Sequence, residues 1–149
     1  MSELRRILLV EDNANDVELT LAAFEEHRLA NEVVVARDGV EALDYLFCRG
    51  PHAERVPGSP AVVLLDLKLP KVNGLEVLAA VRGEPSLQTL PIVVLTSSRE
   101  EPDLQRCYDL GVNAYVVKPV EFGDFIQAVG HLGVFWALIN QPPPGSLPA

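Results

Sequence analysis

The sequence predicts an α/β fold, in which helices cover both faces of a doubly wound five-stranded parallel sheet in (βα)5 order. Two observations predict this class. Short continuous apolar runs rich in Val, Ile and Leu are typical of strands buried on both faces of a parallel sheet. Stretches with helical periodicity separate these runs along the whole chain, and such regular alternation is characteristic of βαβ units.

The individual elements follow from apolar periodicity and from signals at their ends. We expect strands near residues 5–10, 32–37, 61–66, 91–96 and 113–118. We expect helices near residues 14–29, 39–49, 74–83, 99–110 and 121–139. Asp38 with Glu41 fits the capping-box pattern that marks a helix start. Ser98 with Glu101 fits the same pattern, and Gly111 fits a C-terminal stop for the fourth helix.

The fifth helix carries apolar residues at three- and four-residue steps, so one of its faces should pack on the sheet. Glycines at positions 123, 130 and 133 interrupt it, each costing about 1 kcal/mol relative to Ala in a helix interior. Phe135 and Trp136 are adjacent and cannot share one helix face, so one ring should be exposed or covered by a partner. We therefore expect a homodimer through the fifth-helix face.

Length and composition indicate a single domain, residues 1–149, with a core at about 5–139, a turn-rich connection at 50–60 and a proline-rich tail at 140–149. The chain has 12 Lys and Arg against 21 Asp and Glu, and the net charge of −9 disfavours a nucleic-acid partner. No apolar run approaches the roughly 18 residues of a membrane span, and the amino terminus does not fit a signal peptide. We expect a cytoplasmic protein without membrane contact.

The cysteines and histidines show no metal-ligand spacing. Cys48 and Cys107 stand alone inside helical patterns, so we expect both to be small buried hydrophobes in a reducing compartment. His27, His52 and His131 are far apart and have no companion ligands nearby, so surface or core roles are expected for them.

Four apolar runs end at residues that can handle phosphate: Glu11 and Asp12, Asp66, Thr96, and Lys118. Because ligands of open α/β sheets bind outside the carboxyl ends of the strands, these side chains should converge on one pocket. Carboxylates within ~4 Å of one another would repel by about 4 kcal/mol per pair at an effective dielectric of about 20, so we expect Mg²⁺ among them. A carboxylate can attack phosphorus, while Lys118 and the Thr96 hydroxyl would stabilise phosphate oxygens.

The chain is similar to the receiver domain of two-component response regulators in the order and strand context of four segments: Glu11-Asp12, LLDLKLPKVNG around Asp66, VVLTSS around Thr96, and Lys118-Pro119. The resemblance covers about residues 5–138 and implies the flavodoxin-like receiver fold. It also implies a Mg²⁺ site made by Asp12, Asp66 and the backbone carbonyl of Lys68, with Glu11 acting directly or through water.

The same resemblance implies a phosphoryl-transfer chemistry. Asp66 would be the phosphoacceptor for a phosphohistidine of a sensor histidine kinase, and Lys118 and Thr96 would assist it. Thr96 and Tyr115 would be the switch residues, and the Lys118-Pro119 peptide would be cis. No enzymatic activity is implied beyond Mg-dependent self-phosphorylation from a phosphodonor and slow autodephosphorylation.

A narrower resemblance points to the single-domain regulators that pair with bacterial phytochromes. It rests on the connection at 50–60, the segment DLKLPKVNG and the aromatic end followed by PPP. It implies a phytochrome-type sensor kinase as partner. Since no output domain is expected in the chain, the signal would leave by protein contact or by phosphorelay.

Other interpretations of these residues and of the fold also need to be considered. Thr96 fits a strand simply as a β-branched residue, and Tyr115 could be an aromatic packed at a strand edge. An unphosphorylated pseudo-receiver acting as a protein-interaction module would keep the fold without the chemistry. Toprim-like nucleases are disfavoured because Lys68 stands where they have a second aspartate. Haloacid-dehalogenase-like phosphatases want Asp-x-Asp after the first strand, and dinucleotide-binding folds want glycines; EDNAND at residues 11–16 provides neither.

Overall fold

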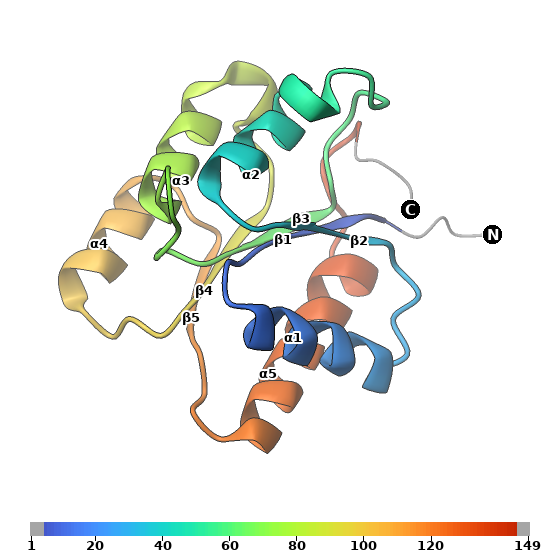
Figure 1. Ribbon diagram of the computed structural model, residues 1–149, viewed down its shortest axis with the longest axis vertical. Coiled ribbons are helices and arrows are strands. Elements are labelled where there is room, and N and C mark those ends of the chain that lie inside the picture. Colours follow the sequence, from blue (N-terminus) through green and yellow to red (C-terminus); the bar gives the residue numbers. More distant parts are fainter. Residues whose placement is uncertain (1–4, 146–149) are drawn as a thin grey trace.

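The computed structural model describes residues 5–145 and contains a five-stranded parallel sheet in the order β2-β1-β3-β4-β5 (Figure 1). The strands are β1 (Ile7–Val10), β2 (Val33–Ala36), β3 (Val62–Leu65), β4 (Ile92–Thr96) and β5 (Ala114–Val117). Neighbouring strands are parallel throughout. The chain turns from β2 back across β1 to β3, which creates the switch point where open α/β sheets bind ligands. The predicted fold class is confirmed.

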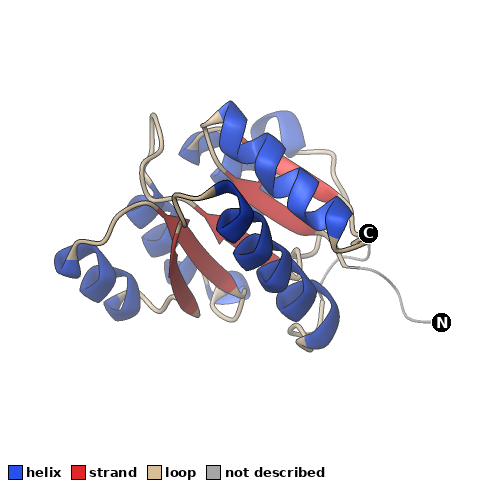
Figure 2. Cartoon of the chain, turned by 90° about the horizontal axis from the view of Figure 1, so that it is seen from below, coloured by secondary structure: helices blue, strands red, loops and turns tan. Residues whose placement is uncertain are grey.

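The α-helices of the described chain are α1 (Ala14–Glu26), α2 (Gly39–Leu46), α3 (Gly74–Gly83), α4 (Glu101–Asp109) and α5 (Phe122–Val134). Helices α1 and α5 pack together on one face of the sheet, and α2, α3 and α4 cover the other (Figures 1 and 2). Alternation along the strands divides the core between these faces. In β1, Ile7 and Leu9 join the apolar cluster under α1 and α5, while Leu8 and Val10 join the cluster on the opposite face.

The start of α4 differs from the prediction. The helix begins at Glu101, and Glu100 precedes it without a side-chain cap. Pro102 lies in the first turn, where a missing N–H costs no helical hydrogen bond, so the helix starts beside it. Ser98, the predicted cap, instead donates to Asp103 Oδ2 (2.6 Å) and accepts a hydrogen bond from the Glu100 N–H (3.3 Å).

Two other end signals are confirmed. Asp38 Oδ1 accepts a hydrogen bond from the Glu41 N–H at 2.7 Å, which caps α2. The second bond of the predicted capping box does not form, because Glu41 Oε2 accepts from the Arg37 N–H at 3.1 Å instead. Gly111 follows α4 with a φ of 88°, a left-handed conformation that glycine adopts without strain.

The fifth helix changes its hydrogen-bond pattern near its end. A π-helix, Phe135–Ile139, continues α5, and the Asn140 N–H donates to the Phe135 carbonyl at 2.7 Å. Trp136 packs against the apolar cluster under α1 and α5, whereas Phe135 is 46% exposed. The expectation that only one of these adjacent rings could enter the core is confirmed.

The combined helical segment Phe122–Ile139 is long and apolar enough to span a membrane, by length and composition alone. Core helices of globular proteins can pass the same test, so the signal is weak. Here Phe125, Ile126 and Val129 are buried in the cluster that faces the sheet. The apolar character of this segment is therefore partly explained by packing.

The connection at 50–60 and the proline-rich tail lie against each other. Arg55 organises the connection: its guanidinium donates to Tyr45 O (2.6 Å) and Gly58 O (3.1 Å) and lies 4.2 Å from the centre of the Tyr45 ring. The Ser59 N–H donates to Gly145 O at 3.3 Å. The tail therefore returns to the body of the domain.

One expectation for a single residue is wrong, and one contact between histidines was not expected. Cys107 is buried, but Cys48 is only partly buried, because it lies just beyond the end of α2 with a φ of 53°. The rings of His27 and His131 are 5.6 Å apart despite their separation in sequence. They meet because α1 packs closely on α5 at Gly130, where a Cβ would lie 2.1 Å from the His27 ring. No third candidate ligand joins them within residues 5–145.

Candidate functional site

The carboxyl ends of four strands bring the predicted site residues together. Glu11 and Asp12 follow β1, Asp66 follows β3, Thr96 ends β4, and Lys118 follows β5. The backbone N–H groups of Glu11, Asp66 and Lys118 each donate to a carbonyl of a neighbouring strand, at 2.9, 3.1 and 2.7 Å respectively. The sheet therefore fixes the points from which these side chains extend.

Glu11, Asp12 and Asp66 form an acidic cluster whose candidate ligand atoms all lie within 4.8 Å of one another. Glu11 and Asp66 are only 3% and 8% exposed, whereas Asp12 is exposed. Carboxylate oxygens are preferred ligands of hard divalent cations. Because the carboxylates also repel one another, this donor set fits a divalent cation.

Lys118 places a positive charge at the edge of the cluster. Its Nζ donates to Glu11 Oε1 (2.5 Å), Asp16 Oδ2 (2.8 Å) and Asp66 Oδ2 (2.9 Å). An ammonium group has three N–H donors, so all of them are used. Burial lowers the pKa of Lys118, but hydrogen bonds to the three carboxylates outweigh burial and leave the pKa raised above its ordinary value. Lys118 is therefore a fixed cation at neutral pH.

Glu11 has an unusual protonation equilibrium. Burial raises the pKa of Glu11 to about 7, against the lowering effect of the Lys118 hydrogen bond, and the charge of Asp66 raises it further. The Asn13 N–H donates to Glu11 Oε2 at 3.2 Å. When no cation compensates the cluster, Glu11 can therefore take up a proton near neutral pH.

Asp66 is held by the loop that leads into α3. The Lys68 N–H donates to Asp66 Oδ1 (3.3 Å), while Oδ2 accepts from Lys118. The start of α3 lies directly against this loop, because a Cβ on Gly74 would lie 2.3 Å from Asp66 O and 2.6 Å from Leu67 Cα. A glycine at this position is what allows α3 to begin so close to Asp66.

Thr96 and Tyr115 are connected through the loop after β4. Thr96 is fully buried, and its Oγ1 accepts a hydrogen bond from the Ser98 N–H (3.3 Å). The Tyr115 hydroxyl donates to Ser98 O (3.1 Å), and its ring packs against the cluster on the α2 face of the sheet. Ser98 therefore links the two predicted switch residues.

Asp16 is the residue of this site that sequence reasoning missed. It lies in the first turn of α1, where its N–H donates to the capping oxygen of Asn13 at 3.0 Å. The signal that could have identified Asp16 was its position, about one helical turn beyond Glu11 and Asp12 in the sequence. Whether such a residue faces the sheet edge depends on how α1 is rotated about its axis, and the sequence pattern does not define that rotation.

The expected cis peptide is wrong. Residues 5–145 contain no cis peptide bond, so the Lys118-Pro119 bond is trans. The trans form of such a bond is favoured by about 0.5–1 kcal/mol. With this bond trans, the Lys118 amine already reaches all three carboxylates.

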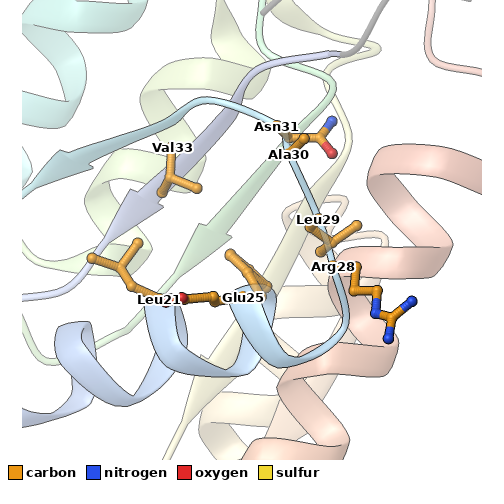
Figure 3. Close-up of a pocket in the computed structure, with 8 residues that line it drawn as sticks. Leu21, Glu25, Arg28, Leu29, Ala30, Asn31 and Val33 are labelled. Carbon is orange, nitrogen blue, oxygen red and sulfur yellow. The ribbon is translucent and has the colours of Figure 1, made fainter.

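Two hollows help to locate the site on the molecule. One of about 360 Å³ borders it and is lined by Asp16, Lys118 and Phe122 among others. A larger open hollow of about 510 Å³ lies at the far end of α1 beside the edge strand β2, and Figure 3 shows Leu21, Leu29 and Val33 on its wall. That larger hollow includes no residue of the acidic cluster, so it is separate from the site.

In this doubly wound sheet, an acidic cluster and the half-buried Lys118 meet outside the carboxyl ends of the strands. The fold and site define a class of α/β proteins that can bind a divalent cation and an anionic group side by side. The sequence model of the response regulator receiver domain matches residues 7–130. This chain belongs to the response regulator receiver family. The family resemblance predicted from the strand-end residues is thus confirmed.

Individual relatives show which members of the family this chain resembles. Response regulator Rcp1 of Synechocystis is 38% identical over 130 residues, 87% of each chain, and its Mn²⁺-bound structure matches with a TM-score of 0.87 and 35% identity over 93% of this chain and 99% of that one. The bacteriophytochrome response regulator AtBRR is 66% identical, with a TM-score of 0.75 over 94% of this chain and 100% of that one. The phosphorylated cyanobacterial phytochrome response regulator RcpA is 39% identical, with a TM-score of 0.87 over 94% and 99%. The predicted similarity to phytochrome-associated regulators is confirmed.

Proposed function

We propose that this protein is a phosphoreceiver, in which Asp66 accepts a phosphoryl group from a phosphohistidine of a sensor histidine kinase. The observation that carries the proposal is the pairing of Asp66 Oδ2 with Lys118 Nζ at 2.9 Å within a cluster that fits a divalent cation. A carboxylate oxygen is a competent nucleophile toward phosphorus. Fixed positive charge around the transferring group supplies the electrostatic stabilisation that phosphoryl transfer needs.

The proposed cation is Mg²⁺, held by Asp12, Asp66 and the backbone carbonyl of Lys68, with Glu11 acting directly or through water. When bound, Mg²⁺ would neutralise the cluster and supply positive charge beside the phosphoryl oxygens. The carboxylate donor set supports this assignment. Lys118 would stabilise the phosphoryl oxygens that the cation does not contact.

Thr96 is proposed to sense the phosphoryl group. Its Oγ1 accepts a hydrogen bond from the Ser98 N–H, which leaves its own O–H free to donate to a phosphoryl oxygen. Any displacement of Thr96 would be felt at Ser98 and therefore at Tyr115, whose hydroxyl holds the Ser98 carbonyl. This link is a route by which phosphorylation would reach the β5 surface.

The proposed donor is a phytochrome-type histidine kinase, supported by the similarity to AtBRR and RcpA. An accessible apolar surface lies beside the acceptor, where Val120 is 97% and Phe122 is 64% exposed next to the hollow that Lys118 lines. A kinase domain docked there would bring its phosphohistidine towards Asp66. We place this exchange in the cytoplasm, without nucleic acid or membrane.

We further propose a homodimer through α5 and its π-helical extension. Phe135, Leu138 and Ile139 are 46%, 49% and 61% exposed and lie close together at the end of this segment. A two-fold contact would bury this apolar surface on both copies. A dimeric regulator would also match the symmetry of a dimeric kinase.

Residues 1–149 are proposed to act as one receiver domain, with no enzymatic activity beyond self-phosphorylation and slow autodephosphorylation. We also propose that the protein signals by protein contact or by phosphorelay. An unphosphorylated pseudo-receiver has no observation in its favour, because the candidate acceptor and its countercharge are both in place.

Phosphotransfer from a purified histidine kinase tests the proposal. A bacteriophytochrome kinase labelled on its histidine with [γ-³²P]ATP should pass the label to the wild-type protein in the presence of Mg²⁺, and Asp66→Asn should receive none. Histidine kinases with other kinds of sensor domain, assayed in parallel, show whether the transfer is specific for the bacteriophytochrome kinase. Equal labelling of wild type and Asp66→Asn would overturn the assignment of the acceptor.

A further inference from the structure

We infer that Asp16 is a positioning residue, which tethers the Lys118 amine beside Asp66 while a cation and a phosphoryl group occupy the acidic cluster. The inference rests on the proposed function and deepens it. None of the strand-end residues predicted from the sequence has this task.

The partners of Lys118 fall into two kinds. Glu11 and Asp66 belong to the acidic cluster that fits a divalent cation, whereas Asp16 lies outside it. A bound cation and a phosphoryl group would both compete with Lys118 for oxygens of Glu11 and Asp66. Asp16 is the partner of Lys118 that neither the cation nor the phosphoryl group would contact.

Asp16 is well placed to keep this contact. It belongs to the first turn of α1, and its backbone is fixed by the hydrogen bond from its N–H to Asn13 Oδ1 (3.0 Å). Its side chain is 23% exposed and lies at 2.8 Å from Lys118 Nζ. The carboxylate therefore approaches the ammonium from the helix, on a different element from the strands that carry the acidic cluster.

The tether matters because the Lys118 side chain has an alternative position open to it beside the site. The hollow of about 360 Å³ beside the site is lined by both Asp16 and Lys118, and its wall includes Phe122. A lysine stem has four flexible carbons. Without Asp16, an amine released from Glu11 and Asp66 could swing into this hollow, away from the phosphoryl oxygens.

Three variants separate the tether from general effects of charge and folding. Asp16→Ala removes the tether, while Asp16→Asn keeps a carbonyl oxygen that can still accept from the amine. Glu18→Ala removes an exposed charge from the same helix, where the side chain of Glu18 makes no hydrogen bond or ion pair among the described residues. Thermal unfolding of all variants with Mg²⁺ identifies any loss of the fold.

The first measurement does not involve phosphorylation. Acetylation of lysines by an activated ester, followed by peptide mass spectrometry, reports the accessibility of Lys118 in the Mg²⁺-loaded protein. Lys71, whose side chain is 66% exposed, serves as the internal reference. We expect Lys118 to be acetylated several-fold faster in Asp16→Ala than in wild type, and at the wild-type rate in Asp16→Asn and Glu18→Ala.

The second measurement is the rate of phosphorylation by acetyl phosphate at saturating Mg²⁺. We expect the limiting rate to fall several-fold in Asp16→Ala, with little change in the half-saturating donor concentration and substantial recovery in Asp16→Asn. In a Lys118→Ala background the same change should have no further effect, because the two residues act through one contact.

The two measurements separate the tether from the proposed function. An unlabelled wild type would overturn the phosphoreceiver proposal, while the acetylation pattern would still decide for or against the tether. If Lys118 in Asp16→Ala is acetylated at the wild-type rate with Mg²⁺ bound, the tether does not exist. A wild-type phosphorylation rate in Asp16→Ala would equally overturn it.

Discussion

Glu11 and Asp12 are neighbours in sequence but differ in the properties that decide cation binding. Glu11 is buried and already accepts hydrogen bonds from Lys118 and from the Asn13 N–H. Asp12 is exposed and makes no hydrogen bond in the described part of the chain, so its oxygens are available to a cation. Substitutions of Glu11 and Asp12 are therefore expected to change the Mg²⁺ affinity by different amounts.

Asp12→Ala should weaken Mg²⁺ binding by at least about tenfold, which corresponds to about 1.4 kcal/mol. Glu11→Ala should weaken it less, because Glu11 is partly committed to Lys118. Isothermal titration calorimetry of both variants decides the order. Affinities that stay equal and unchanged in both would refute the cation site.

The protonation of Glu11 predicts how stability depends on pH. Its pKa of about 7 in the folded protein lies above the ordinary value of 4.5, so the folded protein binds more protons than the unfolded chain between these values. The free energy of unfolding should therefore fall as the pH rises from about 4.5 through about 7. Protonation of Glu11 removes the cost of burying its charge and also relieves its repulsion by Asp66, and this stabilisation is lost on the alkaline side.

Urea unfolding of the metal-free protein, at pH values from about 5 to about 8, measures this dependence. Glu11→Gln has no carboxyl to titrate and should show a flatter profile than the wild type. Parallel profiles for the two proteins would show that another group is responsible.

At the scale of secondary-structure elements, the start of α3 holds Asp66, the proposed acceptor, in place. A Cβ on Gly74 would collide with backbone atoms of Asp66 and Leu67, which cannot move aside as a flexible side chain can. The distance between α3 and the loop after β3 is therefore set by the absence of a side chain. A larger residue there must displace the loop that carries Asp66.

Gly74→Ala should lower the free energy of unfolding by about 1–3 kcal/mol, the usual cost of overpacking. It should also slow the proposed phosphorylation of Asp66, because the loop that carries this residue is displaced. Gly83→Ala is the matched control, since a Cβ at Gly83 meets nothing within 4 Å, and it should be neutral or stabilising by up to about 1 kcal/mol. Urea unfolding compares them, and equal effects in both would contradict the close contact.

At the scale of the whole molecule, the exposed end of the fifth helix predicts self-association. Sedimentation velocity at micromolar concentration should show a dimer, and Phe135→Ala should shift it towards monomer, because Phe135 is the exposed ring of the pair. Trp136→Ala should instead lower stability, because Trp136 packs against the apolar cluster under α1 and α5. A wild-type species near 16.2 kDa, unaffected by Phe135→Ala, would rule out the dimer.

The fold and the strand-end residues were predictable because they leave local patterns in the sequence. Buried parallel strands appear in the sequence as apolar runs. Glu11, Asp66 and Lys118 can be identified because each directly follows such a run, and no knowledge of packing between elements is needed. Features set by packing between elements left no such signal. The contact of Asp16 with Lys118 depends on the rotation of α1, and the pairing of His27 with its distant neighbour depends on where α1 and α5 meet.

The local misses have local causes. Ser98 matched a capping pattern, but α4 begins at Glu101 with Pro102 in its first turn. The Ser98 hydroxyl therefore bonds to the side chain of Asp103 in α4 instead of capping the helix backbone. The Lys118-Pro119 bond was expected to be cis on the strength of the family alone, and the intrinsic preference for trans prevails in this structure.

Intact-protein mass spectrometry after incubation with acetyl phosphate and Mg²⁺ tests the central claim most directly, because it needs no knowledge of the kinase. The wild type should gain one phosphoryl group, and this gain should disappear when Mg²⁺ is removed with a chelator. Asp66→Asn should gain none under the same conditions. Persistent phosphorylation of Asp66→Asn at the wild-type level would contradict the account.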